Sequence, residues 1–569
     1  MSVMIGIDLG TSTTEATVLK DGRPVMIPNL YGSMITPSVV GVDREGKYVF
    51  GEQAKAQYLL EPENTVIEMK RKIGTAEKIP MGGKEYTALE LSSLLLGHIK
   101  EYAEEFLGEE VDRAVISVPA YFDELKRQET VEAGKRAGFL VERIINEPTA
   151  AALSYGMEHM DEESHVLVYD LGGGTFDVTL LEMFGGVLEV KASSGDNQLG
   201  GKDFDQRLVD WFVEQFQSRH GINLRKNTVA MVKLKEQAER CKKELSEKDS
   251  FQVLIPFITE KNGNPLALDE TVTVEQFEKM TKDLVERTHG PIDVVLADSG
   301  VPVTDIDRII LVGGSTRMPM ISKDIENYLH KTPSVAVHPD YAVAQGAAVQ
   351  AGIIEGALAG DDAIIMTDVC PYTLGVRALN QFGWDYMSVV IPRNITIPAV
   401  RNNMYYTSFD GQTEAHIEVY QGESQDVEKN HFLGDFTISG IPFGKAGKEQ
   451  IEVQFSYNLN GMLEVMAKII STGEYAGVEI NMLNTGMPDK EKEEKLDVSG
   501  WKDTSLAKRF RTVIRRAERR LKQEEVQSMP FYVVDLEESL YDLKLALIQD
   551  DLETAEELEE ELLDMLGDI

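Results

Sequence analysis

The alternation of apolar and polar positions divides the chain into three regions. Over the first 360 residues, short apolar runs bounded by Gly, Pro or Asp alternate with amphipathic segments of helical spacing. This pattern is typical of buried strands and covering helices in an α/β domain. We expect strands at residues 3–7, 114–118, 166–169 and 309–312, and helices at residues 88–107 and 232–245.

From about residue 369 the period changes to strict alternation, as in residues 451–455. Turn signals such as Asp410-Gly411 and Asn460-Gly461 separate these runs. Alternation with short turns predicts an antiparallel β domain over residues 369–487. Residues 361–368 form an acidic and then apolar linker before it, and such a linker is expected to bury itself against a surface.

After Pro488 the apolar positions return to helical spacing and predict a short helical region over residues 488–569. Asp550, with Glu553 three residues later, is expected to cap the last helix. The apolar stripes of the three predicted helices are Leu506, Phe510, Val513, Ala517 and Leu521, then Leu536, Leu540, Leu543 and Leu547, then Leu552, Ala555, Leu558, Leu562 and Leu566.

One motif occurs twice, 162 residues apart. Asp8-Leu9-Gly10 and Asp170-Leu171-Gly172 each follow a predicted strand and precede a second β-branched run, as in a hairpin. The repeat predicts two similar lobes that face one another, with a ligand between them.

Composition and charge narrow the functional classes. The chain has 569 residues, of which 42% are apolar and 27% charged, as in a folded protein of several domains. Its net charge of −39 makes nucleic acid an unfavourable partner. Two cysteines cannot form a disulfide framework, and we find neither a signal peptide nor a membrane span, so we expect a cytoplasmic protein.

The repeated motif has the chemistry of a phosphate loop. Gly10 and Gly172 allow tight turns whose amides and hydroxyls reach phosphate oxygens. Two further glycine pairs, Gly200-Gly201 and Gly313-Gly314, support nucleotide binding. The chain has no Walker A motif and no GxGxxG at the start of a helix, so neither a P-loop nor a Rossmann site is expected. An Asp in each loop would repel phosphate unless Mg²⁺ lies between them, held largely through water.

Several long motifs, in order from residue 3 to about 490, resemble the seventy-kilodalton heat-shock chaperones of the DnaK type. The chain is closest in pattern to the HscC branch at residues 368–375 and 419–423 and in its short C-terminus. The motifs that carry the family resemblance are residues 5–14, 118–122, 146–152, 169–177 and 311–319.

The resemblance implies an actin-like ATPase domain over residues 1–360 that uses ATP/ADP and Mg²⁺. Lys70, Glu147, Asp170 and Thr175 would be catalytic; Asp8 and Asp170 would position Mg²⁺ through water, and Asp177 would hold a monovalent cation such as K⁺. Lys243 stands where many relatives have Arg, which would weaken stacking on adenine. The implied nucleotide-binding residues are Gly10, Thr11, Ser12, Gly172, Gly173, Gly174, Gly200, Gly201, Glu239, Lys242, Lys243, Ser246, Gly313, Gly314, Ser315, Arg317 and Asp340.

The resemblance also implies that the β domain is a sandwich that binds extended apolar peptide segments of unfolded proteins. Each candidate residue could instead belong to the sandwich core. The nearby alternation of Phe382, Trp384 and Tyr386 fits either an accessory ledge or an ordinary strand face. The implied lining residues are Leu374, Val376, Tyr405, Ala415, Ile417 and Val419, with Leu379 and Ser408 as an arch over the peptide.

By the same resemblance, ATP binding and hydrolysis would control peptide affinity through the linker. Arg143, Asn146 and Asp368 match the surface that engages J-domain co-chaperones, and Pro119 and Arg127 match the relay from nucleotide to linker. The apolar linker ends in Thr367 where Leu is usual, so weaker docking is expected. The sequence leaves the need for an exchange factor, the clients and the oligomeric state open.

The C-terminal helical region, about 80 residues, implies a short lid. Residues 529–569 carry a net charge of −13 and residues 489–528 a net charge of +3. Acidic helices that fold back on a basic helix, or a solvated acidic tail, would both explain this. A sugar-kinase-like ATPase is one alternative, but it leaves the β domain and the linker unexplained. An actin-like cytoskeletal ATPase is another, but it leaves the last 200 residues without a role.

Overall fold

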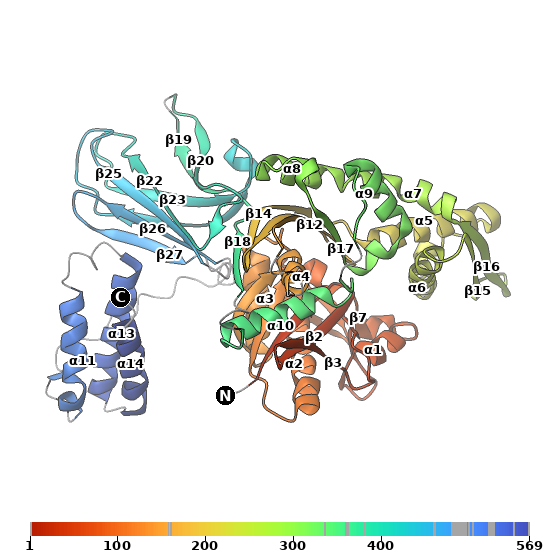
Figure 1. The fold of residues 1–569 in the computed structure, drawn as a ribbon, viewed down its shortest axis with the longest axis horizontal. Helices are drawn as coiled ribbons and strands as arrows, with labels where there is room; N and C mark the ends of the chain where they lie inside the picture. The colour runs from red at the N-terminus through yellow and green to blue at the C-terminus, as the bar shows by residue number, and fades with distance from the viewer. Residues whose placement is uncertain are drawn as a thin grey trace. The chain divides into compact units, whose positions relative to one another are not determined.

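The computed structural model describes most of the chain, and it divides into two compact units, Met1–Thr485 and Gly486–Ile569 (Figure 1). The turn at Asn460-Gly461, the linker before Ile364 and the predicted cap Asp550 lie outside the described residues. The described residues are 3–157, 159, 162–334, 337–358, 364–380, 382–458, 462–479, 498, 501–502, 504, 506–521, 530–549 and 552–566.

The first sheet, that of lobe I, is built around the first copy of the repeat. β1 (Met4–Leu9) runs parallel to β10 (Arg113–Val118) and antiparallel to β2 (Thr13–Lys20). β11 (Leu140–Asn146) and β3 (Arg23–Ile27) complete the order β11-β10-β1-β2-β3. The hairpin that the sequence predicts after Asp8 is therefore present.

The second sheet, that of lobe II, repeats this arrangement. β12 (Ser164–Leu171) runs parallel to β17 (Arg308–Val312) and antiparallel to β13 (Phe176–Phe184), which pairs with β14 (Val187–Asp196). In both sheets the first strand of the repeat lies between a parallel neighbour from later in the chain and the antiparallel strand that follows it directly. The repeated motif thus marks a repeated supersecondary structure, and each Asp-Leu-Gly turn lies at the same end of its hairpin.

Helices cover both sheets (Figure 1). α2 begins with a capping box, in which Thr87 Oγ1 accepts from the Glu90 amide at 3.1 Å and the Thr87 amide donates to Glu90 Oε2 at 2.7 Å. Its bounds are those predicted. The helices of this region are α1 (Gly51–Tyr58), α2 (Ala88–Leu107), α3 (Glu124–Arg136), α4 (Glu147–Gly156), α5 (Gly201–His220), α6 (Thr228–Leu245), α7 (Val274–Glu286), α8 (His289–Ser299), α9 (Pro319–Leu329) and α10 (Ala342–Ile354).

α10 lies so close to its neighbours that only glycine fits at the contacts. A Cβ at Gly346 would lie 1.7 Å from the Ala150 carbonyl oxygen, and one at Gly6 would lie 2.2 Å from the Ala348 nitrogen. The small residues of α10 therefore allow the helix to pack closely against its neighbours. Within the described part of the chain, no helix combines the length and apolar character needed to cross a membrane.

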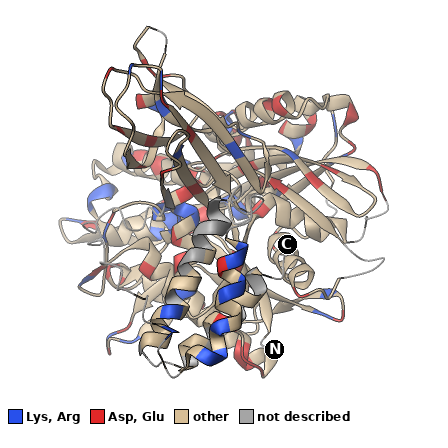
Figure 2. Cartoon of the chain, turned by 90° about the vertical axis from the view of Figure 1, so that its left-hand side faces the viewer, with Lys and Arg blue, Asp and Glu red and all other residues tan. Residues whose placement is uncertain are grey.

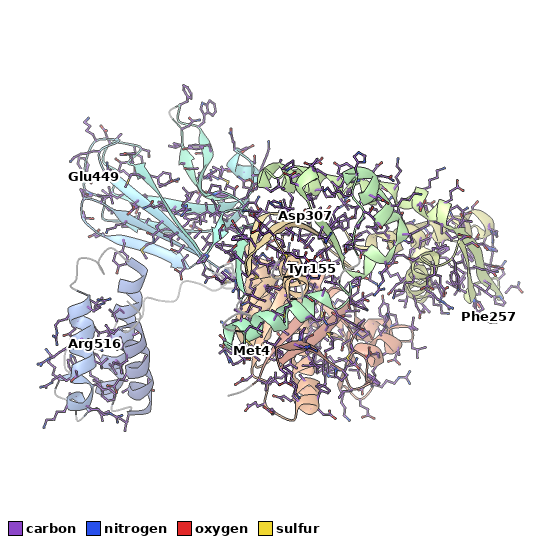
Figure 3. The ribbon with its side chains drawn as sticks, viewed as in Figure 1. Met4, Tyr155, Phe257, Asp307, Glu449 and Arg516 are labelled. Atoms are coloured by element: carbon purple, nitrogen blue, oxygen red, sulfur yellow. The ribbon has the colours of Figure 1, made fainter. Side chains whose placement is uncertain are left out.

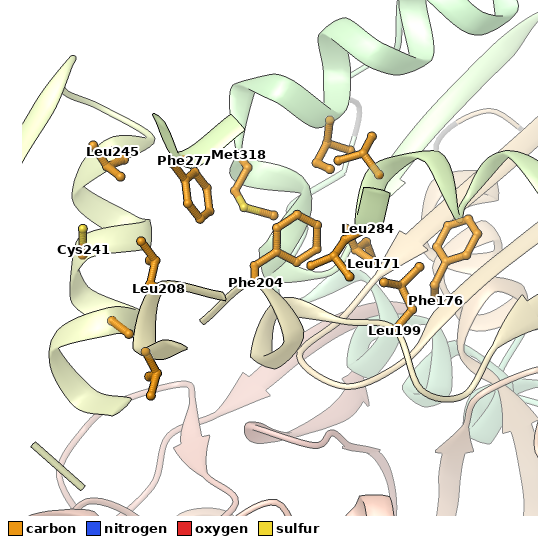
Figure 4. Packing of buried hydrophobic residues seen from close by; sticks show 14 of the residues in the cluster. Leu171, Phe176, Leu199, Phe204, Leu208, Cys241, Leu245, Phe277, Leu284 and Met318 are labelled. Atoms are coloured by element: carbon orange, nitrogen blue, oxygen red, sulfur yellow. The ribbon is translucent and has the colours of Figure 1, made fainter. Parts of the chain in front are cut away.

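The core of lobe II is a large cluster of aromatic and aliphatic side chains (Figure 4). Phe204 and Phe277 are buried there with a ring separation of 6.4 Å. Lobe II also contains a hairpin of β15 (Ser250–Lys261) and β16 (Asn264–Thr273). Phe257 is exposed in this hairpin, at a shift in the strand register (Figure 3).

The linker forms a strand of the lobe II sheet. β18 (Ile365–Val369) pairs in parallel with β14 from Val187 to Glu189, and then with β21 (Thr396–Ile397) of the β domain. Ile364 is buried in the core of the first domain. The expectation that an apolar linker would find a surface is met by this added strand.

The β domain consists of two four-stranded antiparallel sheets that share one core. Val419 and Phe455, from opposite sheets, are fully buried in that core. The first sheet has the order β20 (Asp385–Ile391), β19 (Leu374–Leu379), β23 (Glu414–Gln421) and β24 (His431–Ser439), and the second the order β22 (Ala399–Tyr406), β25 (Gln450–Tyr457), β26 (Leu463–Ile469) and β27 (Tyr475–Glu479).

Polar contacts join the β domain to lobe II. The Arg393 guanidinium donates to both carboxylate oxygens of Asp298, at 2.7 and 2.9 Å, and Asn394 Nδ2 donates to the same carboxylate at 2.8 Å. Asn394 Oδ1 accepts from the Ser193 amide at 3.1 Å. These bonds fix the β domain against the edge of the sheet that the linker extends.

The C-terminal unit contains α11 (Ala507–Arg520), α13 (Pro530–Gln549) and α14 (Leu552–Met565), which pack through the apolar stripes read from the sequence, except for Leu552, which is exposed. Lys and Arg are frequent in α11 (Figure 2). Among the described side chains, Lys544 of α13 pairs with Glu518 of α11 at 2.8 Å. In this pair the base comes from the acidic region and the acid from the basic helix. The three helices share one apolar cluster.

One acidic side chain is buried where α3 meets the β domain. The side chain of Glu124 is 1% exposed and accepts from Gln128 Nε2 at 3.0 Å. Burial raises its pKa to about 8, although Gln128, Arg127 and the backbone of Leu463 in β26 lower it and Asp123 adds a smaller rise. Burial at this contact thus favours the protonated form of Glu124, while the Leu463 backbone opposes it.

We predict that docking of the β domain weakens as the pH rises from 6 to 8. Burial holds a proton on Glu124 in the docked form, and exposure on undocking would return its pKa toward the ordinary value of 4.5 and release that proton. Between the two pKa values, the contribution of Glu124 to the docking constant falls about tenfold per pH unit. Glu124→Gln should remove this contribution, measured by energy transfer between dyes in lobe II and the β domain.

Glu129→Gln is the matched control for this prediction. Glu129 lies in the same helix and has a raised pKa, but its carboxylate accepts from the Gly74 amide in lobe I. Its replacement should leave the pH dependence of docking as in the unmodified protein. Equal pH dependence in Glu124→Gln and the unmodified protein would refute the prediction.

Candidate active site

The two glycine turns of the repeat face each other across the cleft between the lobes. A Cβ at Gly173 would lie 2.3 Å from Ser12 Oγ, and a Cβ at Gly174 would lie 2.7 Å from Thr11 Oγ1. The absence of side chains therefore lets the two turns approach closely and leaves their backbone groups accessible. This is the arrangement predicted for the two phosphate loops.

The other two glycine pairs join the same place. Gly313, at φ +84°, follows β17, and a Cβ there would lie 2.4 Å from the Leu171 carbonyl oxygen. The Gly201 amide and Ser315 Oγ both donate to the Gly172 carbonyl, at 3.0 and 2.8 Å. All four glycine-rich segments singled out in the sequence are thus neighbours in space.

Lys70 and Glu147 form a buried ion pair beside these turns. Lys70 Nζ lies 2.5 Å from Glu147 Oε1, and their side chains are 5% and 10% exposed. Lys70 lies in a 3₁₀ turn, η2 (Met69–Lys72), and Glu147 is the first residue of α4. Sequence position alone gives no sign that a lysine in a basic run is buried against a helix start.

The aspartates of the site are held in a strongly acidic environment. Burial and the charge of Glu147 raise the pKa of Asp8 to about 7, against the opposing effects of Lys70 and of Ser117 Oγ, which donates to Asp8 at 2.7 Å. Burial and Glu147 also raise the pKa of Asp177 to about 7. Both carboxylates therefore favour a nearby cation.

Asp170 and Glu15 complete this group. Burial and the neighbouring carboxylates of Glu147, Asp177 and Asp8 raise the pKa of Asp170 well above its usual range. Burial, with Asp8 next, raises the pKa of Glu15. Glu15 was not predicted as a site residue, because an acidic residue in a strand gives no signal that it points into a cleft.

A cavity of about 80 Å³ collects most of the predicted phosphate and metal residues. Asp177 lies outside its lining, and Glu15, Pro339 and Val343 are lining residues that the sequence did not indicate. The predicted residues in the lining are Asp8, Gly10, Thr11, Ser12, Lys70, Glu147, Asp170, Gly172, Gly173, Thr175, Gly313, Gly314 and Asp340.

A second cavity of about 250 Å³ shares Thr11 and Ser12 with the first. Glu239 and Lys243, predicted for the adenosine side, line it and form an ion pair at 2.7 Å. Further charged and aromatic groups from both lobes line it without having been predicted, including Lys55, Tyr58, Glu68, Arg71, Lys202 and Lys235.

The remaining adenosine candidates are distributed around these cavities. Lys242 is buried, pairs with Asp205 at 2.8 Å and donates to the Gly201 carbonyl at 2.9 Å. Arg317 pairs with Asp340 at 2.5 Å. Ser246 instead lines a third cavity, beyond the C-terminal end of α6, and its hydroxyl donates to the Lys242 carbonyl at 3.2 Å.

The candidate peptide residues divide into two groups. Tyr405 and Ala415 are partly buried at the edge of the core, and Tyr405 donates to Ser388 Oγ at 2.9 Å. Leu379 and Ser408, the predicted arch, are exposed, as are Phe382 and Trp384 beside them. The residues in the buried sandwich core are Leu374, Val376, Ile417 and Val419.

The candidate coupling residues meet at the linker. Arg127 donates to the carbonyls of Ala120 and Phe122, at 2.9 and 3.1 Å, and to Asn146 Oδ1 at 2.8 Å. Asn146 Nδ2 in turn donates to Asp368 Oδ2 in β18 at 2.8 Å. Pro119 is buried at the start of the same loop, and the charge of Asp368 partly offsets the effect of burial on the pKa of Arg143, which is lowered.

Comparison with known proteins identifies the family. The family model for the Hsp70 protein matches residues 4–568. Chaperone proteins DnaK from Thermotoga neapolitana and Thermotoga maritima are each 47% identical over 488 residues, which covers 85% of this chain and 80% of theirs.

The chain belongs to the Hsp70 family. It is an ATP-dependent molecular chaperone and an ATPase, and the match extends through the β domain and the C-terminal helices. A sugar-kinase-like or cytoskeletal function is therefore not favoured. The closer assignment to the HscC branch stays a prediction.

We predict that Lys70→Met lowers the rate of ATP hydrolysis about 100-fold, the cost typical of losing one group that stabilises charge in a transition state. The substitution removes the ammonium group that faces Glu147 and the cavity. Single-turnover hydrolysis with excess enzyme would measure this rate.

Lys72→Met is the control, because Lys72 lies in the same turn but pairs on the surface with Glu77 at 2.6 Å. It should hydrolyse ATP as the unmodified protein does. A Lys70→Met protein with a normal hydrolysis rate would contradict this assignment of Lys70.

Proposed function

We propose that ATP binds between the two lobes with its phosphates against the turns Gly10–Ser12 and Gly172–Thr175. The observation that carries this proposal is the convergence of the two close-packed glycine turns on one cavity that also contains Lys70. Backbone amides and one ammonium group suit a polyphosphate chain. The remaining nucleotide contacts would come from the other two glycine pairs.

Buried carboxylates on both sides of this cavity call for a divalent cation. Asp8 and Asp170 carry oxygen ligands of the kind that Mg²⁺ prefers, and both gain from a neighbouring positive charge. Among the described residues, no three acidic, His or Cys side chains are arranged to hold a metal directly. We therefore infer that Mg²⁺ is held through water and nucleotide phosphates, where it would neutralise phosphate charge.

Asp177 lies next to this group but faces the loop after Pro119. Its Oδ1 accepts from the Tyr121 amide at 3.0 Å. Burial beside Glu147 favours a positive charge here as well, and we assign Asp177 to a monovalent cation such as K⁺.

Hydrolysis needs positioning and charge neutralisation more than covalent chemistry. Lys70 would neutralise charge on the γ-phosphate, and Glu147 and Asp170 would orient the attacking water. Thr175 also lines the cavity, and its hydroxyl would lie beside the γ-phosphate. The Lys70–Glu147 pair would then serve two purposes, since it also holds Lys70 in place.

The adenosine would lie toward the second cavity and the Arg317–Asp340 pair. Glu239 and Lys243 line that cavity, and Lys242 supports the Gly201 turn. Ser246 lies at the end of α6 and faces the third cavity, so it would contact the base only from that side.

For clients, we propose an extended apolar peptide bound by the β domain. Exposed Leu379 and Ser408 would cover the peptide, and Tyr405 and Ala415 would border its site. The peptide site would be supported from below by four residues of the sandwich core, Leu374, Val376, Ile417 and Val419. The small Ala415 and polar Ser408 would give a pocket of a shape different from that of other family members.

Coupling would run through the linker. The chain of hydrogen bonds from the loop after Pro119 through Arg127 and Asn146 to Asp368 joins the nucleotide side of the first domain to β18. ATP would favour this docked arrangement and low peptide affinity, and hydrolysis would release it. A J-domain co-chaperone would act at the same place, with Arg143 as a contact.

Peptide release tests this function. We expect ATP to accelerate dissociation of a fluorescent apolar peptide at least tenfold relative to ADP, which is a coupling free energy in the usual range of 1–3 kcal/mol. The rate would be measured by stopped-flow anisotropy after mixing with unlabelled peptide. Release at equal rates with ATP and ADP would refute the coupling.

The linker offers a separate prediction. Thr367 Oγ1 is buried and has no hydrogen-bond partner among the described residues. Thr367→Val removes this hydroxyl at nearly constant volume, so docking of β18 should strengthen by about 1 kcal/mol. Hydrogen exchange of the amides of β18 would measure the gain as slower exchange.

Thr179→Val is the comparison, because Thr179 Oγ1 does have a partner, Ser193 Oγ, at 2.8 Å in the same sheet. There the substitution should destabilise the sheet. Faster exchange of β18 in Thr367→Val would show that its hydroxyl contributes to docking instead of opposing it.

A further inference from the structure

Tyr372 connects the β domain to the first domain through both its ring and its hydroxyl. It lies between the linker strand β18 and β19. Its hydroxyl donates to the Tyr121 carbonyl at 2.7 Å, and the two rings are 4.3 Å apart at 36°. Burial strongly raises the pKa of Tyr372, so the hydroxyl keeps its proton and acts as a donor.

Tyr121 is in turn bound to the nucleotide side of lobe II. Its amide donates to Asp177 Oδ1 at 3.0 Å, while its carbonyl accepts from Asn197 Nδ2 at 2.6 Å in addition to Tyr372. Gly195, opposite Asp177 in the β13–β14 pair, leaves room for this approach, since a Cβ there would lie 3.2 Å from Tyr121 Cβ.

The neighbouring residue of the same loop contacts the catalytic candidate. Lys70 Nζ lies 5.6 Å from the centre of the Phe122 ring, within the range of a cation–π contact. Phe122, Asn197 and Thr175 also line one small cavity with Lys70. A displacement of residues 121–122 would therefore be felt by Asp177 and by Lys70.

We propose that the Tyr372 hydroxyl is a positioning group which, when the β domain is docked, holds the Tyr121–Phe122 loop against Asp177 and Lys70. This inference rests on the proposed function and adds a second connection to the one through Arg127 and Asp368. The two routes leave the loop by different atoms, the Tyr121 carbonyl and the carbonyls of Ala120 and Phe122.

Of the two donors to the Tyr121 carbonyl, one comes from each side of the domain contact. Asn197 follows β14 at the end opposite to Val187–Glu189, where the linker strand pairs, and Tyr372 comes from the segment between β18 and β19. Undocking would therefore remove the Tyr372 donor and leave the Asn197 donor in place. The loop would then be held from the side of lobe II alone.

The ring contact and the hydroxyl make separable predictions. If Tyr372 served only to pack the two domains, the ring alone would suffice, and Tyr372→Phe would behave as the unmodified protein. If the hydroxyl positions the loop, Tyr372→Phe should retain the folded, peptide-binding β domain and lose part of the coupling to ATP.

The test measures peptide release and ATP affinity in full-length Tyr372→Phe. We expect the acceleration of peptide release by ATP to fall about fivefold, which is the effect of one hydrogen bond. Because coupling is reciprocal, the effect of bound peptide on ATP affinity, measured by equilibrium titration, should shrink by the same factor. Peptide affinity without nucleotide should stay unchanged.

Tyr420→Phe is the matched control. Tyr420 lies in β23, and its hydroxyl donates to Glu418 at 2.7 Å and accepts from Arg377 at 3.0 Å, both within the β domain. This variant loses a hydrogen bond of equal length but should keep full coupling.

The outcomes distinguish a failure of the proposed function from a failure of the positioning role of Tyr372. If the unmodified protein shows no acceleration by ATP, the proposed function fails. If it does and Tyr372→Phe equals it, the positioning role is refuted. A loss of nucleotide-free peptide affinity in Tyr372→Phe that is as large as its loss of coupling would also refute the role, since that result reports damage to the β domain alone.

Discussion

The crowding of carboxylates around one buried ammonium group is the constraint on which the rest of the structure depends. Asp8 and Glu147 come from lobe I and Asp170 from lobe II, and each lies near Lys70. Such a group is unfavourable without compensating positive charge, because burial penalises every ionised carboxylate. The two lobes therefore form a site whose acidic side chains favour a bound cation.

The same region is connected to the edge of the molecule where the β domain docks. Asp177 holds Tyr121, and the loop that follows reaches Lys70 on one side and the linker on the other. In the proposed function, a change of charge in the cleft and a change of pairing at β18 would act on one short loop. Such a connection would join the proposed nucleotide and client sites, which lie in different domains.

Three polar side chains lie where the β domain meets the first domain. Thr367 places in the linker strand a buried hydroxyl that has no partner among the described residues, and Tyr372 adds a hydroxyl donor just after that strand. Glu124 adds a buried carboxyl group whose pKa is raised. These three residues lie on one seam, so the strength of docking in this protein is set by polar groups as well as by apolar contact.

Periodicity and repeated motifs were sufficient to predict four strands of the first domain, the α2 helix, the antiparallel domain and most of the three C-terminal stripes, because these depend on local spacing. The glycine-rich turns were also recognisable, since their chemistry is contained in a few consecutive residues. Glu15, Glu124, Tyr121 and Tyr372 could not be assigned in this way. Their roles follow from burial and from partners distant in the chain, and only the tertiary structure decides which polar side chains lose their water.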